Sequence, residues 1–526
     1  MSNRPGIAQR AVNATWSLFT GKQASTRTIT RRIRPAVHGK RSFAAGDVDT
    51  PTQNFLGSNL SVNEELRRSL PRMRARSRQL CMDNDYAKRF LHMVKTNVVG
   101  PSGINLQCQF LNDKGEQDIA DCQMVEGKFR EWGKRKNCSI DGQVSWLSLQ
   151  ALVISTIARD GEVLVEKISN RKNKFGLRLR VMECDHLDIN HNEIWRNGNR
   201  VVMGVEMDNT DKPVAYHLSD LHPGGSAGNG HQKRRRVLAT NMLHIFITER
   251  PGQVRGIPWM HTAIKRLNML GGYEEAELVA ARIGASKMGF YTTPEGDGPS
   301  ASSFAPGSDD DDDGGDYDLV EEVEPGLIQN LPVGAAFTSF DPTHPTTAYA
   351  DFTREVLRGA ASGLNVAYNT WANDLEGVNF SSIRSGVLDE RDQWRVVQTW
   401  LADELHGEVF DDWFNWQVDF GELTKLPQDK LETKFADITW QARGWDWVDP
   451  LKDVRAKAEE YELGVTTLTD IAASKGKTLL DIFKQKRAEL DLAEEYGLEV
   501  GKLIYHAMAL EEKSDEEQTI KPNKPA

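Results

Sequence analysis

The chain has 526 residues and a formal net charge of −11, and 39% of its residues are hydrophobic. This length allows a large core and more than one domain, whereas no apolar run approaches the ~20 residues that span a bilayer. Five cysteines in so long a chain exclude a disulfide framework and suit a reducing compartment. The first residues lack a continuous apolar stretch, so we expect no secretory signal.

Charge is distributed unevenly along the chain. Residues 1–78 carry fifteen Lys and Arg against four Asp and Glu, a net of +11, whereas residues 288–353 carry fourteen acidic residues and no Lys or Arg. A protein that grips nucleic acid along its whole surface would be basic throughout. The pattern instead predicts a basic arm over residues 1–60 and a local acidic element. Residues 27–34 of the arm could pair as a strand, touch DNA or a scaffold, or belong to a loosely docked segment.

The pattern after the arm predicts helices. We expect the first from near Pro71, and a second that Asn84 or Asp85 caps and Gly100-Pro101 ends. Two more are expected from about Gln117 to Trp132 and from near Ser145.

Strand patterns then alternate apolar and polar residues. Five strands are expected, beginning at Glu162, Leu177, Val201, Pro213 and Leu243. The segment between the last two, HPGGSAGNGHQKRRR, is glycine-rich and then basic, which favours a loop.

A long helical pattern starts at Pro258, a residue suited to the first turn of a helix, and continues to Met288. Gly271-Gly272 in its middle weakens the helix or lets another backbone come close. A second helix is expected over residues 346–363, a polar loop over 364–381 and a third helix from 382. Aromatic residues after Gly407 indicate core packing.

The last part of the chain is again helical in pattern, from Pro450 to about His506. Thr467 and Asp470 form a plausible capping pair, and Gly476 is a plausible helix end. The final residues, 511–526, have the composition of a disordered tail.

Residues 183–193 contain side chains of the metal-ligand types, namely Cys184, Asp185, His186, His191 and Glu193. Their spacing matches no closed zinc pattern, and Asp, Asn and His are also common where a strand ends in a turn. The acidic run has no calcium-loop register, and no P-loop occurs. We therefore predict no catalytic residue, no metal and no cofactor.

Several segments together resemble lambda-type tailed-phage portal proteins. The most specific is AASGLNVAYNTWANDLEGVNFSSIRSG, residues 360–386. Residues 75–107, RDGEVLV at 159–165 and RPGQVRGIP at 250–258 resemble family segments in the same order. The resemblance covers roughly residues 69–420. Members of the family form a ring, usually of twelve subunits, at one capsid vertex, through which DNA is packaged and ejected.

The resemblance implies an α+β portal fold with a mixed α/β wing, a long helical stem, a small clip insertion and a helical C-terminal crown. The implied divisions are a basic arm at 1–60, wing at 61–257, stem helix at 258–288, acidic clip at 289–345, second stem helix at 346–363, tunnel loop at 364–381, long helix and wing at 382–449, crown at 450–510 and tail at 511–526.

The resemblance also implies where DNA would pass. The tunnel-loop candidates are Trp371, Asn373, Asp374, Leu375, Glu376 and Asn379. For Trp371, packing beneath the loop is the alternative. The basic candidates along the stem are Lys265, Arg266, Arg282, Lys287, Arg354 and Arg358. Their alternative role is in salt bridges with Glu274, Glu275, Glu277 and Glu355. The clip candidates are Asp309, Asp310, Asp311, Asp312 and Asp313, a run that departs from anything matched in the family.

The expected partners are further copies in a ring, double-stranded DNA, the large terminase subunit, major capsid and scaffolding proteins, and head-completion or adaptor proteins, with no membrane. The expected location is the virion, at the portal vertex, and the host cytoplasm during assembly. Two alternatives remain: a metal-dependent DNA-processing enzyme using residues 183–193, and a protein that binds DNA through its basic N-terminal arm.

Overall fold

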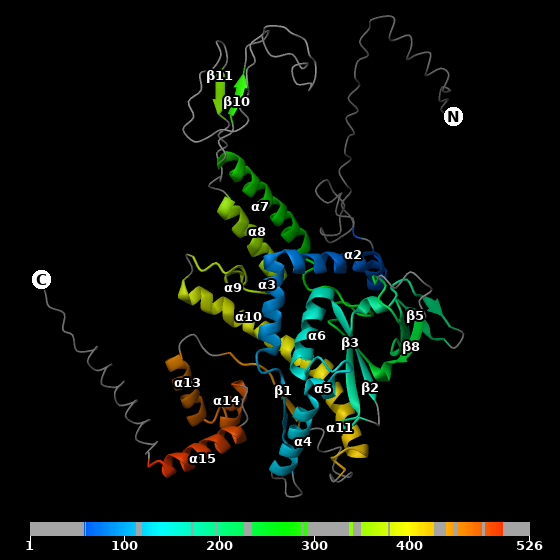
Figure 1. The fold of residues 1–526 in the computed structure, drawn as a ribbon, viewed down its shortest axis with the longest axis vertical. Coiled ribbons are helices and arrows are strands. Elements are labelled where there is room, and N and C mark those ends of the chain that lie inside the picture. The colour runs from blue at the N-terminus through cyan, green and yellow to red at the C-terminus, as the bar shows by residue number, and fades with distance from the viewer. Residues whose placement is uncertain are drawn as a thin grey trace, which may run out of the picture. The chain divides into compact units, whose positions relative to one another are not determined.

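The computed structural model describes residue 57 and residues 59–111, 118–169, 173–195, 198–225, 234–285, 289–292, 336–339, 349–376, 379–424, 438–445, 450–475 and 479–497. The predictions for the basic arm, the acidic run at 309–313, Lys287, Gly476 and the tail lie outside these residues. Within them the chain combines helices and strands, which confirms the α+β class (Figure 1). No helix in the described ranges is both long and apolar enough to cross a membrane.

In the first half of the described chain, helices accompany most of the strands. Their bounds are α2 Val62–Asp83, α3 Asp85–Val94, the π-helix η2 Lys95–Val99, α4 Ile119–Trp132, α5 Arg135–Cys138, α6 Trp146–Asp160 and the 3₁₀ turns η3 Cys184–His186 and η4 Ala239–Asn241.

The second half is mainly helical. Its helices are α7 Ile264–Ala285, α8 Tyr349–Gly363, α9 Tyr368–Ala372, α10 Phe380–Leu401, the π-helix η6 Ala402–Gly407, α11 Glu408–Phe420, α13 Pro450–Glu462, α14 Leu468–Ser474 and α15 Leu479–Glu495.

The strands form four small antiparallel sheets. Their bounds are β1 Asn105–Cys108, β2 Glu162–Ser169, β3 Leu177–Met182, β4 Glu193–Ile194, β5 Arg200–Val202, β6 Val205–Met207, β7 Pro213–Ser219, β8 Arg234–Leu238, β9 Met242–Phe246, β10 Gly289–Thr292, β11 Ala336–Ser339 and β12 Ile438–Gln441. The strand orders are β3-β2-β9, β4-β5-β6-β7-β8, β1-β12 and β10-β11.

Helix α2 begins earlier than the sequence predicted. Ser61 caps it by accepting from the Glu64 N–H, and Val62, Leu66 and Leu70 lie buried along one face. The predicted start near Pro71 is wrong because that proline lies inside the helix, on its exposed side. A proline there removes one N–H donor, and the buried apolar face holds the helix together around it.

The other early helices follow their predicted boundaries. The Asn84 side chain accepts from the Ala87 N–H and starts α3, and Gly100 ends η2 with a positive φ of 69°. Ser145 caps α6 by accepting from the Ser148 N–H. These caps were predictable because a capping side chain bonds to a backbone only three residues away.

Two strand predictions need correction. The segment beginning at Val201 is two strands, β5 and β6, because Met203 and Gly204 turn the chain with positive φ angles. The basic end of the predicted loop is strand β8, which pairs with β7 at the edge of the five-stranded sheet. Edge strands tolerate such charged residues, and this weakens their alternating signal.

The main core lies where α4, α6, α10 and α11 meet the three-stranded sheet. Its centre is aromatic: Phe129 stacks on Trp132 at 5.1 Å and meets Trp413 edge-on at 5.1 Å. The predicted core role of the aromatic segment after Gly407 is confirmed, because α11 buries Phe410, Trp413 and other apolar residues. A smaller cluster joins α2 to the strands of the five-stranded sheet.

The capping pair predicted at Thr467 and Asp470 is also present. The Asp470 N–H donates to the Thr467 hydroxyl at 3.1 Å, and the Thr467 N–H donates to the Asp470 carboxylate at 3.2 Å. This reciprocal pair explains why α14 begins at Leu468.

Candidate functional site

Helices α7 and α8 pack against each other through small groups at their lower ends. The Thr262 hydroxyl donates to the Gly363 carbonyl oxygen at 3.1 Å. A Cβ on Gly359 would lie 1.6 Å from an Arg266 nitrogen, so the arginine side chain crosses directly over this glycine. The predicted first helix begins at Ile264 and not at Pro258, because residues 258–263 form turns that lead into it.

The upper part of the pair is held by aromatic rings. Tyr273 of α7 stacks on Tyr349 with centroids 5.7 Å apart and meets Phe352 edge-on at 5.2 Å. Phe352 is nevertheless 52% exposed. Offset and edge-on contacts of this kind add a modest stabilisation beyond simple burial.

Helix α7 has two different halves. In the first half Ile264, Leu267 and Leu270 are buried in the core. From Gly271 to Arg282 no residue is buried, and Leu278 is 67% exposed. A single chain therefore covers only one half of this helix.

The glycine pair lies at the junction of the two halves. No atom in the described chain lies within 4 Å of a Cβ built on Gly271 or Gly272. Glycine in a helix interior costs roughly 1 kcal/mol relative to alanine, and contacts within this chain give no reason for that cost.

A hollow of about 550 Å³ opens beside the upper half of α7, against the corner between α2 and α3. Its charged lining residues are Asp83, Asp85, Glu274, Glu275 and Arg282. Burial and the nearby Asp85 carboxylate raise the pKa of Glu274. The hollow is thus an acidic surface in which like charges face each other.

The predicted loop contains the short helix α9, which buries Trp371. Its indole N–H donates to the Tyr86 carbonyl oxygen at 2.8 Å, and the two rings lie 5.6 Å apart. Only 1% of Trp371 is exposed, so the structure has the packing alternative and not an exposed indole.

The tip of the loop follows α9. Asn373 ends the helix in the left-handed region, with φ of 54°. The Asp374 carboxylate accepts from the Tyr368 hydroxyl at 2.7 Å and lies 3.4 Å from Arg354; these contacts, with the Glu376 N–H, lower its pKa. Glu376, Asn379 and Leu375, which is 65% exposed, form the solvent-facing part of the loop.

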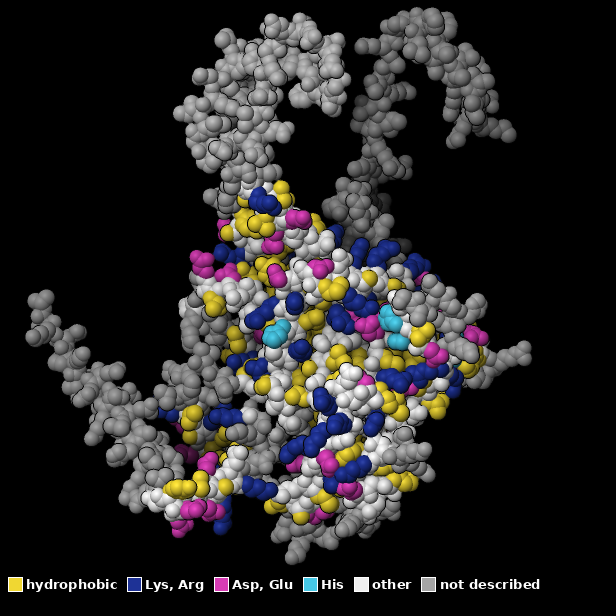
Figure 2. All heavy atoms as spheres, in the orientation of Figure 1, with side chains coloured by type: hydrophobic (Ala, Val, Ile, Leu, Met, Phe, Trp, Pro, Cys, Tyr) yellow, Lys and Arg dark blue, Asp and Glu magenta, His cyan; other side chains and the backbone are white. Residues whose placement is uncertain are grey.

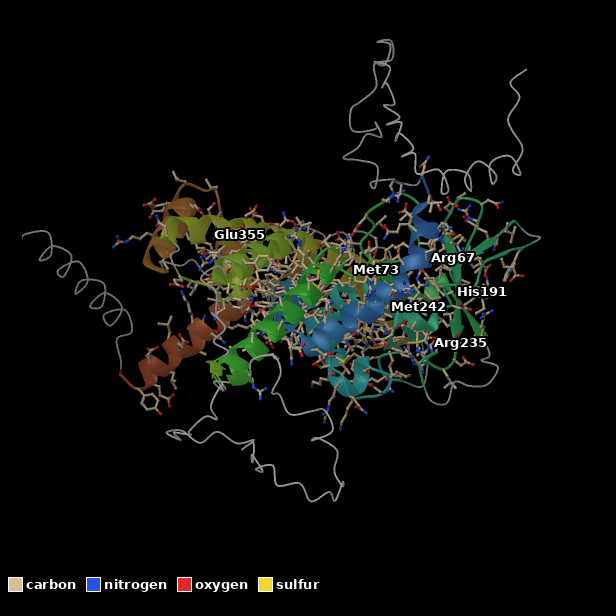
Figure 3. The ribbon with its side chains drawn as sticks, turned by 90° about the horizontal axis from the view of Figure 1, so that it is seen from above. Arg67, Met73, His191, Arg235, Met242 and Glu355 are labelled. Atoms are coloured by element: carbon tan, nitrogen blue, oxygen red, sulfur yellow. The ribbon has the colours of Figure 1, made fainter. Side chains whose placement is uncertain are left out.

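The basic candidates divide into two groups. Arg354 and Arg358 on α8 form ion pairs, and Arg358 lies 2.6 Å from Glu355, which was one of the predicted salt-bridge partners. Figure 3 shows Glu355 on α8, on the other side of the molecule from Arg67 of α2. On α7, Lys265, Arg266 and Arg282 are exposed.

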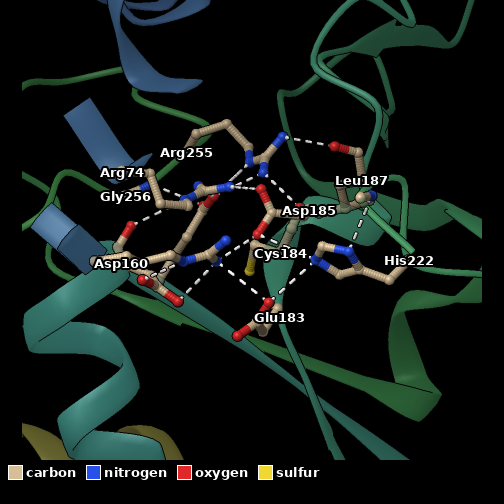
Figure 4. A network of polar contacts seen from close by, with 12 residues as sticks. Arg74, Asp160, Glu183, Cys184, Asp185, Leu187, His222, Arg255 and Gly256 are labelled. Atoms are coloured by element: carbon tan, nitrogen blue, oxygen red, sulfur yellow. Dashed lines mark hydrogen bonds and ion pairs between the residues drawn. The ribbon is translucent and has the colours of Figure 1, made fainter. Parts of the chain in front are cut away.

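The cluster at residues 183–193 folds into a different arrangement from the one its composition suggested. Arg74 and Arg78 of α2 point into it, and both contact Asp185. Arg78 also binds Asp160 at 2.9 Å, and Arg74 binds Glu162 at 2.5 Å (Figure 4).

The centre of this arrangement is Glu162, which is wholly buried. Arg255 lies 2.7 Å from one of its oxygens and His244 lies 2.8 Å from the other. Burial alone would raise the pKa of Glu162, but the arginines and His244 hold it well below its usual range. We call the set of Arg74, Arg78, Arg159, Arg255, Asp160, Glu162, Glu183 and Asp185 the arginine clamp.

Two groups of three side chains in this region have ligand atoms within 4.8 Å of one another, Glu183 with Asp185 and His222, and Glu162 with Cys184 and His244. The carboxylates of both groups already bind arginines, and the clamp matches four carboxylates with four guanidinium groups. A divalent cation would therefore meet like charge. Burial also raises the pKa of Cys184, which disfavours a thiolate ligand.

The two histidines of residues 183–193 make contacts outside the clamp. His186 bonds to the Ser219 carbonyl oxygen at 2.8 Å, and His191 stacks on His217 at 5.0 Å. Sequence reasoning missed the arginines of the clamp. A signal was present, because Arg74 and Arg78 are four residues apart, on the helix face that also carries Leu70.

Comparisons with known proteins identify relatives over most of the chain. The model of the family described as phage portal protein, lambda family, matches residues 49–398. A probable portal protein of Halomonas phage phiHAP-1 is 36% identical over 454 residues, covering 86% of each chain. Portal protein B of Escherichia phage lambda is 20% identical over 456 residues, covering 82% of this chain and 85% of the relative.

Solved structures were matched more weakly. The neck of a native gene transfer agent particle, computed with C12 symmetry, has a TM-score of 0.42 and 12% identity, covering 76% of this chain and 94% of that one. The neck of an empty gene transfer agent particle, computed with C6 symmetry, has a TM-score of 0.40 and 14% identity, covering 77% and 93%.

Proposed function

The chain belongs to the lambda family of phage portal proteins, and from this premise we propose that twelve copies form a ring at one capsid vertex. The channel of this ring would admit DNA during packaging by the terminase and release it on ejection. Head-completion or adaptor proteins would dock on the same ring. The protein would act in the virion, after assembly in the host cytoplasm with capsid and scaffolding proteins.

The observation that carries this proposal is the half-covered helix α7. Its upper half exposes Leu278 and Val279, and it has a glycine pair that no contact in the described chain requires. Isolated exposed apolar residues are ordinary, but an exposed helix face with unexplained glycines fits a surface that a neighbour covers. Successive copies in a ring supply such a neighbour without any other protein.

The parts of the chain are assigned accordingly. We propose α7 and α8 as the stem pair, residues 289–345 as the clip that meets the terminase and adaptors, and residues 364–381 as the tunnel loop. Residues 61–257 and 382–449 would form the wing, and the helices from α13 onward the crown.

The charges of the stem and the loop support a channel that does not hold DNA tightly. Many free Lys and Arg along the wall would bind phosphate strongly. Arg354 and Arg358 of α8 are instead paired with acids, and Glu376 at the loop tip is exposed. Beyond these two arginines, the basic candidates of the proposed stem in the described ranges are few: the exposed Lys265, Arg266 and Arg282 of α7. An acidic or neutral wall repels the polyanion and keeps it mobile.

The arginine clamp bears on the alternative of a metal-dependent nuclease. Asp185 and Glu183 would be its ligands, but both already pair with arginines. Portal proteins of this family are structural components of the particle, and the geometry favours no catalytic role for these residues.

The loop can be tested in assembled particles with Glu376→Lys. Its side chain is exposed, and its replacement leaves the Tyr368–Asp374–Arg354 contacts in place. We expect slower packaging or DNA retained on ejection, measured as packaged DNA per particle over time. Asp419→Lys on α11, an exposed acid outside the proposed stem and loop, is the control. Normal packaging by the Glu376 variant would mean that this residue does not face the DNA.

A further inference from the structure

A second hollow, of about 530 Å³, lies at the C-terminal end of α3. We call it the basic groove, because its charged lining residues are Arg89, Lys95 and Arg443, and His92 lies among them. The other lining residues carry no charge: Met93, Thr96, Asn97, Gly100, Pro101, Ala151 and Thr370. On the face that Figure 2 shows, Lys and Arg side chains gather over α2 and α3.

The arginines of the basic groove are held in place without an acid. Arg89 donates to the Thr370 carbonyl oxygen at 3.4 Å, and Arg443 donates to the Thr96 carbonyl oxygen. Neither of them, nor Lys95, pairs with a carboxylate anywhere in the ranges that the structure describes. Guanidinium groups positioned by carbonyls keep their full positive charge, so the groove is built to accept an anionic group.

An exposed acidic surface lies on another part of the same chain. We call it the acidic ridge: Asp403, Glu404, Glu408 and Asp411, which follow one another along η6 and the start of α11. In the part of the chain that the structure describes, the ion pair made by these four acids is with Lys167, which lies 3.9 Å from Glu408 and pairs more closely with Asp412, at 2.5 Å. None of the four lines the basic groove.

The ridge is crowded with like charge. Carboxylates one helical turn apart repel each other. Partial burial and the neighbouring carboxylates raise the pKa of Glu404 and of Asp411. By contrast, the acids of α8 are already matched, because Glu355 pairs with Arg358 and Asp351 with Arg354. The hollow beside α7 is also acidic, but it has the basic Arg282 among its lining residues. The ridge is therefore an exposed acidic surface that would gain from a cationic partner.

We propose that the basic groove of each copy receives the acidic ridge of the next copy. This inference rests on the proposed ring. A ring closes through contacts in which two different patches of the same chain meet, and the groove and the ridge have opposite charge and no residue in common. Such a contact would set which faces of neighbouring copies meet, and would weaken as salt is added.

The test uses two charge-reversed variants of the full chain. The groove variant is Arg89→Glu with Lys95→Glu, which changes the Lys and Arg groove from +3 to −1 because Arg443 remains. The ridge variant replaces all four acids, Asp403, Glu404, Glu408 and Asp411, with Lys, which changes the ridge from −4 to +4. Each alone places like charges together at every contact, so we expect the fraction of chains in rings to fall on the order of tenfold or more. An equimolar mixture restores opposite charges at every contact of an alternating ring, and we expect rings to return. Particle mass and electron microscopy measure both results.

Three comparisons decide between outcomes. Arg72→Glu with Arg76→Glu reverses two exposed arginines of α2 and should leave assembly unchanged. Wild-type rings together with normal assembly of each reversed variant would overturn the inference and leave the proposed ring standing. A mixture that does not assemble would also overturn it, as would a groove variant that forms rings but loses affinity for duplex DNA. Failure of the wild-type chain to form rings would refute the proposed function itself.

Discussion

The arginine clamp and the α7–α8 pair differ in burial: the clamp buries its central charge, whereas the α7–α8 pair leaves apolar side chains exposed. In the clamp Glu162 is wholly buried, and Arg74, Arg255 and His244 contact it from separate segments of the chain. In the upper half of α7, Leu278 and Val279 are exposed and Gly272 touches nothing beyond its own helix.

The difference distinguishes a buried site whose partners all come from one chain from a helix surface that one chain leaves exposed. A buried carboxylate is tolerated only when its partners are supplied in the same fold, and the clamp supplies them. A helix half without a buried residue gains little from its own chain. We infer that the clamp stabilises the single copy, whereas the stem pair is completed by assembly.

The largest effect should follow from breaking the clamp. Arg255→Met removes a partner that lies 2.7 Å from Glu162 and leaves a buried carboxylate undercompensated. We expect a loss of about 3–5 kcal/mol in the free energy of unfolding, measured by denaturant titration of the unassembled chain.

The matched control for this change lies on the surface. Arg395→Met breaks an ion pair with Asp392 in which both side chains are mostly exposed. Its cost should stay below about 1 kcal/mol. Equal losses for the two variants would contradict the distinction between the clamp and the exposed pairs.

A second effect concerns pH and the aromatic core around His406. His406 is fully buried between Trp146 and Trp440, and burial lowers its pKa to about 4. An unfolded histidine titrates near 6.5, so between these values the unfolded chain binds more protons. Stability is therefore fully present above the unfolded pKa and falls as pH drops from about 6.5 to 4, by roughly 3 kcal/mol from this residue.

His406→Leu isolates this contribution. The wild-type chain and the variant should lose stability in parallel outside that window, and the variant should lose less inside it. Denaturant midpoints at several pH values measure the difference. Identical curves for the two proteins would show that His406 becomes charged without unfolding its surroundings.

The smallest expected effect is that of Gly272→Ala, which should raise the stability of the unassembled chain and lower that of the ring. Gly272→Ala should stabilise the unassembled chain by about 1 kcal/mol, because a Cβ there meets nothing and alanine favours the helix. The same change should weaken the ring if a neighbouring helix packs closely on this face. Thermal unfolding and ring mass report the two effects separately.

Gly127→Ala is the control for that change. This glycine also lies inside a helix, α4, and has open space around its missing Cβ. It should raise stability by a similar amount and leave ring formation unaltered. An unchanged ring for both variants would mean that no neighbour approaches the glycine pair closely.

The parts of the fold that sequence predicted well depend on local chemistry. Asn84, Ser145 and the Thr467–Asp470 pair each bond within three residues, so their patterns are visible in a short window. The helix face of α4 was visible for the same reason, since its apolar residues recur every three or four positions.

The parts that sequence missed depend on distant partners. Arg74 lies 88 residues from Glu162 along the chain, and Arg255 lies 93 residues from it. The local spacing of Arg74 and Arg78 indicated a shared helix face, but no local pattern indicated their partners. The basic strand β8 was read as a loop because pairing with β7, rather than its own alternation, makes it a strand.

In the candidate site, too, the sequence predicted local features and missed those that depend on distant groups. The helical pattern of the sequence located the loop and both helices, and the structure shows that Trp371 packs inward while Leu375 and Glu376 face solvent. Which of the exposed residues would face the proposed channel depends on the neighbouring copies of the proposed ring. A single sequence does not contain that information, because it is set by symmetry.

The central claim is that a neighbouring copy covers the upper half of α7, which one chain leaves exposed. Cryo-electron microscopy of the purified full chain, without nucleotide or DNA, tests this claim most directly. The account predicts closed rings with a central hole wide enough for duplex DNA, in which the upper half of α7 is covered by an adjacent copy. Rings in which Gly272 and Leu278 remain in solvent, or a chain that stays monomeric across salt and concentration, would contradict it.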